Sequence, residues 1–196
     1  GYTLHSDTLM LYAEKAKQLA INQRNLHDEV EAMYYYSCAL TNKGQIDSSL
    51  NVANRCLENL AGVVNDPVLQ AKLLNQKGRC YMRKNQYRDA IDMGYHVISG
   101  AEKSRDTLLQ MMGKTLIGWA YLEMGQHRNA LSWHLKAFET TGNILLLEKY
   151  SILFANLAIN YSNLGKTDSA FYFINRAVSY SRKHQNLFAL SNSLAI

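Results

Sequence analysis

The segment YSNLGKTDSAFYFINRA (161–177) contains the spacing that organises the whole sequence. Three other segments share this spacing: YLEMGQHRNALSWHLKA (121–137), YMRKNQYRDAIDMGYHV (81–97) and LTNKGQIDSSLNVANRC (40–56). Their central residues are Gly44, Asn85, Gly125 and Gly165, which are 41, 40 and 40 residues apart. Four copies at one spacing indicate an internal repeat of about 40 residues.

Three further positions carry a similar type of residue in all four copies. Seven residues before the centre is a small residue: Ser37, Gly78, Gly118 or Ala158. Four before it is Leu40, Tyr81, Tyr121 or Tyr161, and five after it is Ser49, Ala90, Ala130 or Ala170. Glycine and asparagine tolerate the positive φ at which a helix ends, and small residues let two helices approach closely. Each copy is therefore predicted to be a hairpin of a first helix, A, and a second helix, B.

The composition is that of a folded chain rather than a disordered one. Apolar residues make up 47% and charged residues 19% of the 196 residues, with one proline and a formal net charge of +5. No apolar run approaches the ~18–20 residues of a membrane span. The three cysteines are odd in number and form no C-x-x-C pair, so we expect them to fill the core.

The offsets resemble those of the tetratricopeptide repeat (TPR), in a long-repeat variant found in bacterial regulators and scaffold proteins. This resemblance implies an all-α, right-handed αα-superhelix of about four helical hairpins plus partial terminal repeats. The expected units are 1–27 (partial), 28–65, 66–105, 106–143, 144–185 and 186–196 (partial). The opening DTLMLYAEKA (7–16) is similar to the first helix of extracytoplasmic input domains of bacterial sensor kinases and helix-turn-helix regulators. That similarity favours the periplasm over the cytoplasm. The repeat pattern opens on a B helix without its A partner and closes on the start of a fifth A helix, which predicts a fragment of a longer protein.

Residues that could carry chemistry are sparse. His27 and Glu31 have a metal-compatible spacing, but two ligands do not make a site, and carboxylates in a first helical turn offset the helix dipole. His127 and His134 are predicted to be packed core residues. No nucleophile is paired with a base, and no glycine-rich loop follows a strand. We therefore predict a protein that is not an enzyme and has no cofactor or metal.

Helices of type A line the concave surface of such a solenoid, which is the surface these folds use for binding. The residues expected there are Tyr34, Tyr35, Asn75, Gln76, Arg79, Arg83, Met112, Leu116, Trp119, Asn156 and Ile159. They suit a protein or peptide segment with a carboxylate beside an apolar anchor. The predicted function is a peptide-binding scaffold, the sensory or interaction domain of a larger bacterial regulator.

Two further features leave alternatives open. A basic cluster without acids consists of Lys72, Lys77, Arg79, Arg83, Lys84 and Arg88, and it is either a solvated face or a nucleic-acid-binding stripe. The C-terminal residues Leu187, Phe188, Leu190, Leu194 and Ile196 predict the start of a fifth A helix, through which the protein could self-associate.

Overall fold

The chain is a stack of antiparallel helices, seen in a computed structural model that describes residues 2–63, 66–143, 146–147 and 152–183. Within these residues the helices are α1 (Tyr2–Asn22), α2 (Leu26–Asn42), α3 (Ile46–Val63), α4 (Pro67–Arg83), α5 (Tyr87–Ser104), α6 (Thr107–Glu123), α7 (His127–Phe138), α9 (Ile152–Asn163) and α10 (Thr167–Lys183). The A helices are α2, α4, α6 and α9, and each pairs with the B helix that follows it. The described residues contain no strand, and no helix among them is long and apolar enough to cross a membrane. The predicted all-α solenoid is confirmed.

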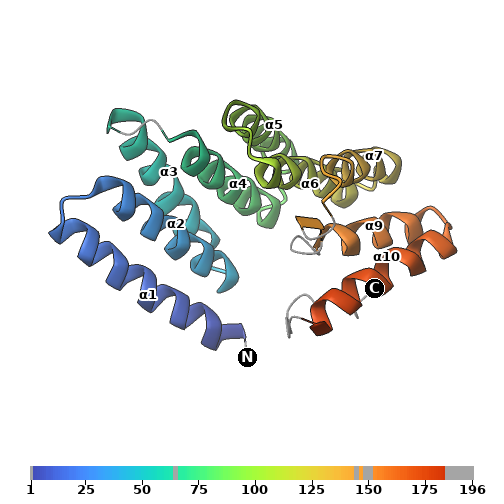
Figure 1. Cartoon of the computed structure of the whole chain (residues 1–196), viewed down its shortest axis with the longest axis horizontal. Coiled ribbons are helices and arrows are strands. Elements are labelled where there is room, and N and C mark those ends of the chain that lie inside the picture. The colour runs from blue at the N-terminus through green and yellow to red at the C-terminus, as the bar shows by residue number, and fades with distance from the viewer. Residues whose placement is uncertain (1, 64–65, 144–145, 148–151, 184–196) are drawn as a thin grey trace.

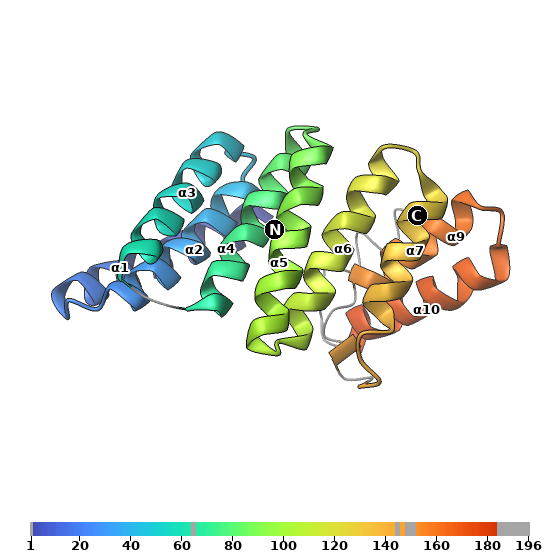
Figure 2. The same cartoon turned by 90° about the horizontal axis from the view of Figure 1, so that it is seen from above.

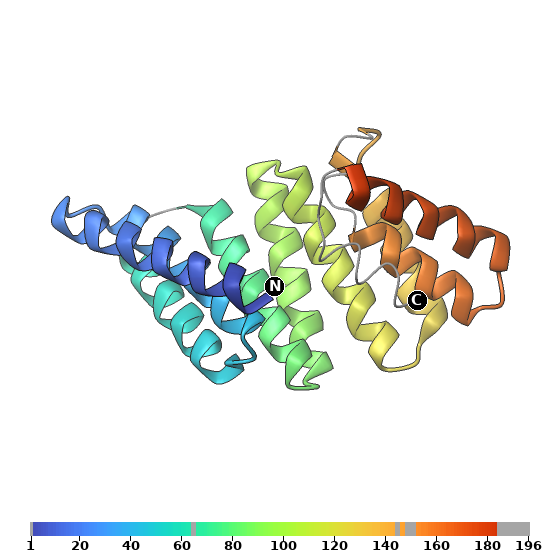
Figure 3. The same ribbon diagram turned by 90° about the horizontal axis from the view of Figure 1, so that it is seen from below.

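The stack is curved, with the A helices on its inner side. Successive A helices contact one another, α2 with α4, α4 with α6 and α6 with α9, more closely than successive B helices do. Figure 1 shows the result, an arc in which α3, α5 and α7 lie on the outer side and α1 and α10 form its two ends. Figures 2 and 3 show the same helices from above and below, stacked side by side along the long axis. We call the side of the arc formed by α2, α4, α6 and α9 the inner surface.

The turns within the hairpins have the predicted left-handed backbone. The φ angles are 78°, 72° and 70° at Gly44, Gly125 and Gly165, and 58° at Asn85. After each turn, the next N–H returns to the carbonyl five residues earlier, as when Gln126 N donates to Tyr121 O at 2.9 Å. This bond caps the end of the A helix. The repeated tyrosine-to-glycine spacing is therefore the spacing of a helix C-terminal cap.

We expect that Gly125→Val lowers the free energy of unfolding by about 1–2 kcal/mol, because a β-branched residue is strained at positive φ. No atom lies within 4 Å of a Cβ built at Gly125, so the loss would come from the backbone alone. Urea unfolding measures it. An unchanged unfolding midpoint would contradict the left-handed cap.

Two connections between hairpins combine an N-cap residue with a preceding residue at positive φ. Asn25 and Asp106 are N-caps, with side chains that accept from Asp28 N and Leu109 N. The left-handed residues there are Arg24 and Arg105, with φ of 53° and 55°. Arginine has no preference for that conformation, so residue type alone did not mark these turns. In the second junction Asp66 caps α4 directly ahead of Pro67.

The small residues on the A helices mark close contacts. A Cβ added to Gly118 would lie 2.6 Å from the Cδ2 and Nε2 atoms of His134 on α7. A Cβ added to Gly78 would lie 2.4 Å from Cδ2 of Leu116 on the next A helix. Glycine at these positions therefore sets the distance both within and between hairpins, as predicted.

Gly118→Ala should destabilise the protein by about 1–3 kcal/mol, because the added methyl group would overlap the buried imidazole of His134, which is also bound to Asn160. Gly142→Ala is the matched control, since nothing lies within 4 Å of a Cβ built there. Thermal unfolding of both variants measures the difference. Equal melting temperatures would show that α6 and α7 are less closely packed than described.

Candidate partner-binding surface

All eleven residues predicted to bind a partner lie on the four A helices, but three of them are buried. Tyr35 and Arg83 are exposed, and Tyr34, Arg79, Met112, Trp119, Asn156 and Ile159 are half-buried. Asn75, Gln76 and Leu116 are only 6%, 1% and 3% exposed, so the prediction that they line the surface is wrong. They occupy positions nine and ten residues before the turn, where neighbouring A helices meet. Tyr35 has the same position as Gln76 and is 43% exposed, since no described A helix precedes α2.

Gln76 lies at the centre of a buried polar network that joins the first two hairpins. Its Nε2 donates to Ser37 O at 3.2 Å, Thr41 Oγ1 at 2.6 Å and Ser49 Oγ at 3.1 Å. Its Oε1 accepts from Arg79 Nη1 at 3.2 Å and from Cys38 Sγ at 3.5 Å. Burying an amide is favourable only when its polar atoms are paired, and here both atoms are. Gln76 is therefore a structural residue, and its hydrogen bond to Arg79 connects the buried network to the inner surface.

Arg79 lies on the inner surface between α2 and α4. Burial raises the pKa of Tyr34 and of Cys38 on α2, and the positive charge of Arg79 opposes that rise in both groups. No carboxylate of the described ranges lies within ion-pair distance of Arg79 or of Arg83. Both arginines keep their charge available to a bound molecule.

The basic cluster is partly neutralised by the first hairpin. Lys72 pairs with Glu31 at 3.2 Å, and Lys84 pairs with Asp47 at 2.6 Å. Lys77 lies over the ring of Tyr81, 5.9 Å from its centroid. A nucleic-acid stripe needs several free cations along a track, so the pairing of two of the six weakens that alternative.

Trp119 packs against the core between neighbouring A helices. Its ring lies against the buried cluster of Met82, Ala90, Leu116 and Ala120, and its Nε1 donates to Glu123 Oε1 at 2.9 Å. Trp119 therefore packs against the core between α4 and α6 and is only partly open on the inner surface.

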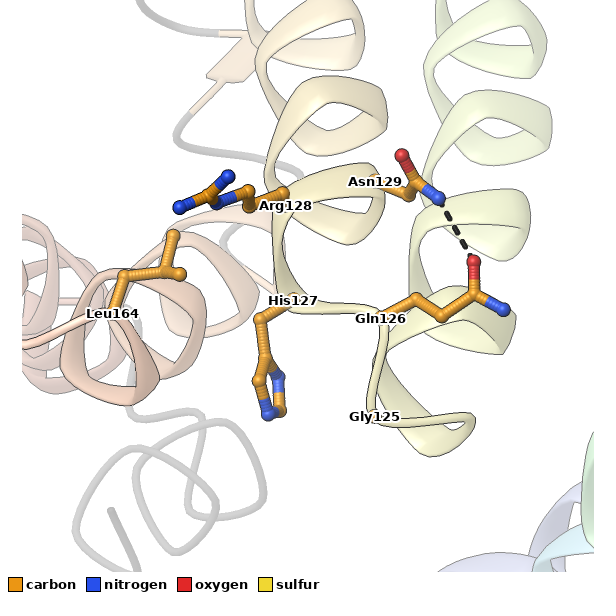
Figure 4. Close-up of a pocket in the computed structure, with 6 residues that line it drawn as sticks. All are labelled: Gly125, Gln126, His127, Arg128, Asn129 and Leu164. Carbon is orange, nitrogen blue, oxygen red and sulfur yellow. Dashed lines mark hydrogen bonds between the residues drawn. The ribbon is translucent and has the colours of Figure 1, made fainter.

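The two histidines of α7 differ. His134 is fully buried, as predicted, and its Nδ1 lies 2.7 Å from Asn160 Nδ2. His127 was predicted to be in the core and is instead half-buried at the turn after α6. It lines an open depression of about 470 Å³ together with Gln126, Arg128, Asn129 and Leu164 (Figure 4). The first position of a B helix faces the neighbouring turn, so periodicity alone misplaced this side chain.

His27 also has a structural role. Its Nδ1 lies 3.1 Å from Asp28 Oδ1, and its Nε2 lies 2.9 Å from Oδ2 of Asp66, the N-cap of α4. Glu31, its predicted metal-spacing partner, pairs with Lys72 instead. No three metal-ligating side chains of the described residues come together as a metal site.

Solved structures supply the fold assignment. The chain aligns with apo RapI at a TM-score of 0.67 and 14% identity, over 90% of this chain and 72% of that one. It aligns with aspartyl phosphate phosphatase F from Bacillus subtilis at a TM-score of 0.69 and 16% identity, over 97% of this chain and 55% of that one. It aligns with nearly identical TPR-like repeats of a kinesin light chain from Podosopora anserina at a TM-score of 0.61 and 13% identity, over 95% of this chain and 99% of that one. The chain is a TPR-like helical solenoid.

At these identities the similarity concerns the fold of the solenoid alone. The chain spans just over half the length of phosphatase F. No family model matches the sequence, and no curated protein matches it. The TPR-like fold confirms the resemblance read from the turn spacing, and function must be argued from the inner surface itself.

Proposed function

We propose that the inner surface binds a segment of a protein, so that the solenoid acts as an interaction module. The observation that carries the proposal is the mixed character of the side chains left partly open there. Tyr35 is an exposed aromatic side chain, and the half-buried Tyr34, Met112 and Ile159 offer further apolar area. Arg79 and Arg83 offer unpaired cations. Interfaces combine a few apolar anchors with charge-assisted hydrogen bonds in this way.

The wider context is proposed on less direct grounds. The TPR-like fold is shared with aspartyl phosphate phosphatase F and with the repeats of a kinesin light chain, and solenoids use their concave side for binding. The module would serve as the sensory or interaction part of a larger bacterial regulator, with the periplasm favoured. Self-association through residues 186–196 is also retained as a proposal, and those residues lie outside the described part of the chain.

Selection from a displayed library of random peptides tests the proposal. For peptides recovered with the intact protein, Tyr35→Ala should weaken binding about tenfold or more, as truncation of an aromatic anchor does. Tyr95→Ala is the matched control, because Tyr95 is 49% exposed on the outer helix α5. Isothermal titration calorimetry measures both. Equal losses, or a loss confined to Tyr95→Ala, would place binding elsewhere.

Nucleic acid is the competing ligand. A single-stranded oligonucleotide should bind weakly and lose affinity steeply with salt, because only counterion release would hold it. Tight, salt-resistant oligonucleotide binding in the absence of peptide binding would reverse the assignment.

A further inference from the structure

Arg79 combines three properties that together suit it to bind an anion. Its side chain is half-buried between two helices, it has no acidic partner among residues 2–63, 66–143, 146–147 and 152–183, and it is held by a hydrogen bond. A cation that is partly removed from water loses hydration, and pairing with an anion normally offsets that loss. Arg79 has no such anion among the described residues.

The hydrogen bond to Gln76 fixes the direction of the guanidinium. Gln76 cannot rotate freely, because its Nε2 is bound to Ser37 O, Thr41 Oγ1 and Ser49 Oγ in the buried network. Its Oε1 therefore occupies a fixed point, from which it engages one Nη1 donor of Arg79 at 3.2 Å. The other donors of the guanidinium remain for a ligand, in the planar fork that matches a carboxylate.

The electrostatic surroundings favour an anion. Arg83 lies one helical turn after Arg79 on α4, and Glu31, an acid of the facing helix α2, is already bound to Lys72. The Tyr34 hydroxyl, near enough to Arg79 to feel its charge, is a further polar group at this place. A carboxylate here would meet a fork whose orientation is set before binding, which lowers the entropy lost on association.

We propose that Arg79 is a carboxylate receptor, positioned by Gln76, which binds an Asp or Glu side chain of the protein segment on the inner surface. The inference rests on the proposed function and specifies the chemistry of its partner. Gln76 acts as a positioning residue that does not touch the ligand.

The receptor can be tested without a peptide. In protein labelled with ¹⁵N, the Arg79 Nε–H resonance is followed while glutarate is added at constant ionic strength against chloride. Arg79 should saturate at a glutarate concentration about tenfold lower than the exposed Arg83, the ratio expected of one preorganised charge-assisted pair. Arg79→Lys keeps the charge but removes the fork, and identifies the resonance. Equal responses of the two arginines would overturn the receptor.

Peptides extend the test to the partner. Peptides selected on the intact protein are synthesised in pairs with Asp or Asn at one position, and wild type should prefer the Asp member about tenfold. Arg79→Gln should abolish that preference. Arg88→Gln should keep it, because it makes the same change of charge at an exposed position of α5. A preference that survives Arg79→Gln overturns the receptor but leaves inner-surface binding intact. A glutarate response at Arg79 without any inner-surface peptide would instead reject the proposed function and retain the receptor.

Discussion

Between pH 7 and pH 4 the protein should lose about 3 kcal/mol of stability through one side chain, His134, since each pKa unit is worth about 1.4 kcal/mol. Burial lowers the pKa of His134 to about 4, from an ordinary value of 6.5. Its Nδ1 faces the Asn160 amide at 2.7 Å, and its Nε2 has no hydrogen-bond partner among the described residues. The native site therefore holds the neutral ring.

The direction of the effect follows from which state takes up the proton. Above pH 6.5 His134 is neutral in both the folded and the unfolded chain, and its contribution is complete. As the pH falls from 6.5 towards 4, the unfolded chain binds a proton that the folded chain excludes, so unfolding becomes easier. Below about pH 4 both states are protonated and the loss levels off.

The measurement is urea unfolding from pH 7.5 to 4, compared between wild type and His134→Gln. The variant cannot titrate at this position, so its stability should fall with pH by about 3 kcal/mol less than that of wild type. His96→Gln, on an exposed face of α5, is the control and should follow the wild-type curve. Parallel curves for wild type and His134→Gln would mean that His134 is not held neutral.

The contribution of His27 to stability changes with pH in the opposite direction to that of His134, so the two effects can be distinguished. Hydrogen bonds to Asp28 and Asp66 raise its pKa. Its stabilising effect is therefore complete below pH 6.5 and is lost as the pH rises through the raised pKa. Because the ring is partly exposed, the effect is small and lies in a different pH range from that of His134.

Gln76→Leu should lower the free energy of unfolding by about 2–4 kcal/mol, the cost of removing a buried amide whose donor and acceptor are both hydrogen-bonded in the network. Leucine is close to glutamine in size, so the loss would report hydrogen bonding rather than a cavity. Ser37 O, Thr41 and Ser49 would lose the donor they share.

Gln70→Leu is the matched control, because Gln70 is exposed on the same helix, and its effect should stay within about 0.5 kcal/mol. Equilibrium unfolding in urea measures both variants. If Gln76→Leu is as stable as Gln70→Leu, the network does not hold the first two hairpins together.

The sequence predicted the hairpins because their determinants are local. A positive φ selects Gly125 or Asn85, and a close helix contact selects Gly118, whatever the rest of the chain does. The curvature of the solenoid is not local. It decides that Gln76 and Leu116 lie between A helices while Tyr35, at the same repeat position as both, stays open.

Arg79 shows the same limit within the candidate site. Its helix and its inward direction followed from the repeat, but the bond to Gln76 depends on Ser49, a residue of a B helix in the previous hairpin. Such an arrangement joins three helices through side-chain atoms, and periodicity carries no information on it. The sequence has no acid between Lys72 and Arg88, but Lys72 and Lys84 find acids on the first hairpin, so the unpaired state of Arg79 could not be predicted from the sequence.

Mapping a selected peptide onto the protein tests the central claim most directly. Amide hydrogen exchange is compared with and without the peptide, because binding protects the backbone amides of the helices that it orders. We expect added protection in α2, α4 and α6, around Tyr35 and Arg79, with α5 and α7 unchanged. Protection confined to the outer helices α3, α5 and α7, around Tyr95 and Trp133, would contradict it.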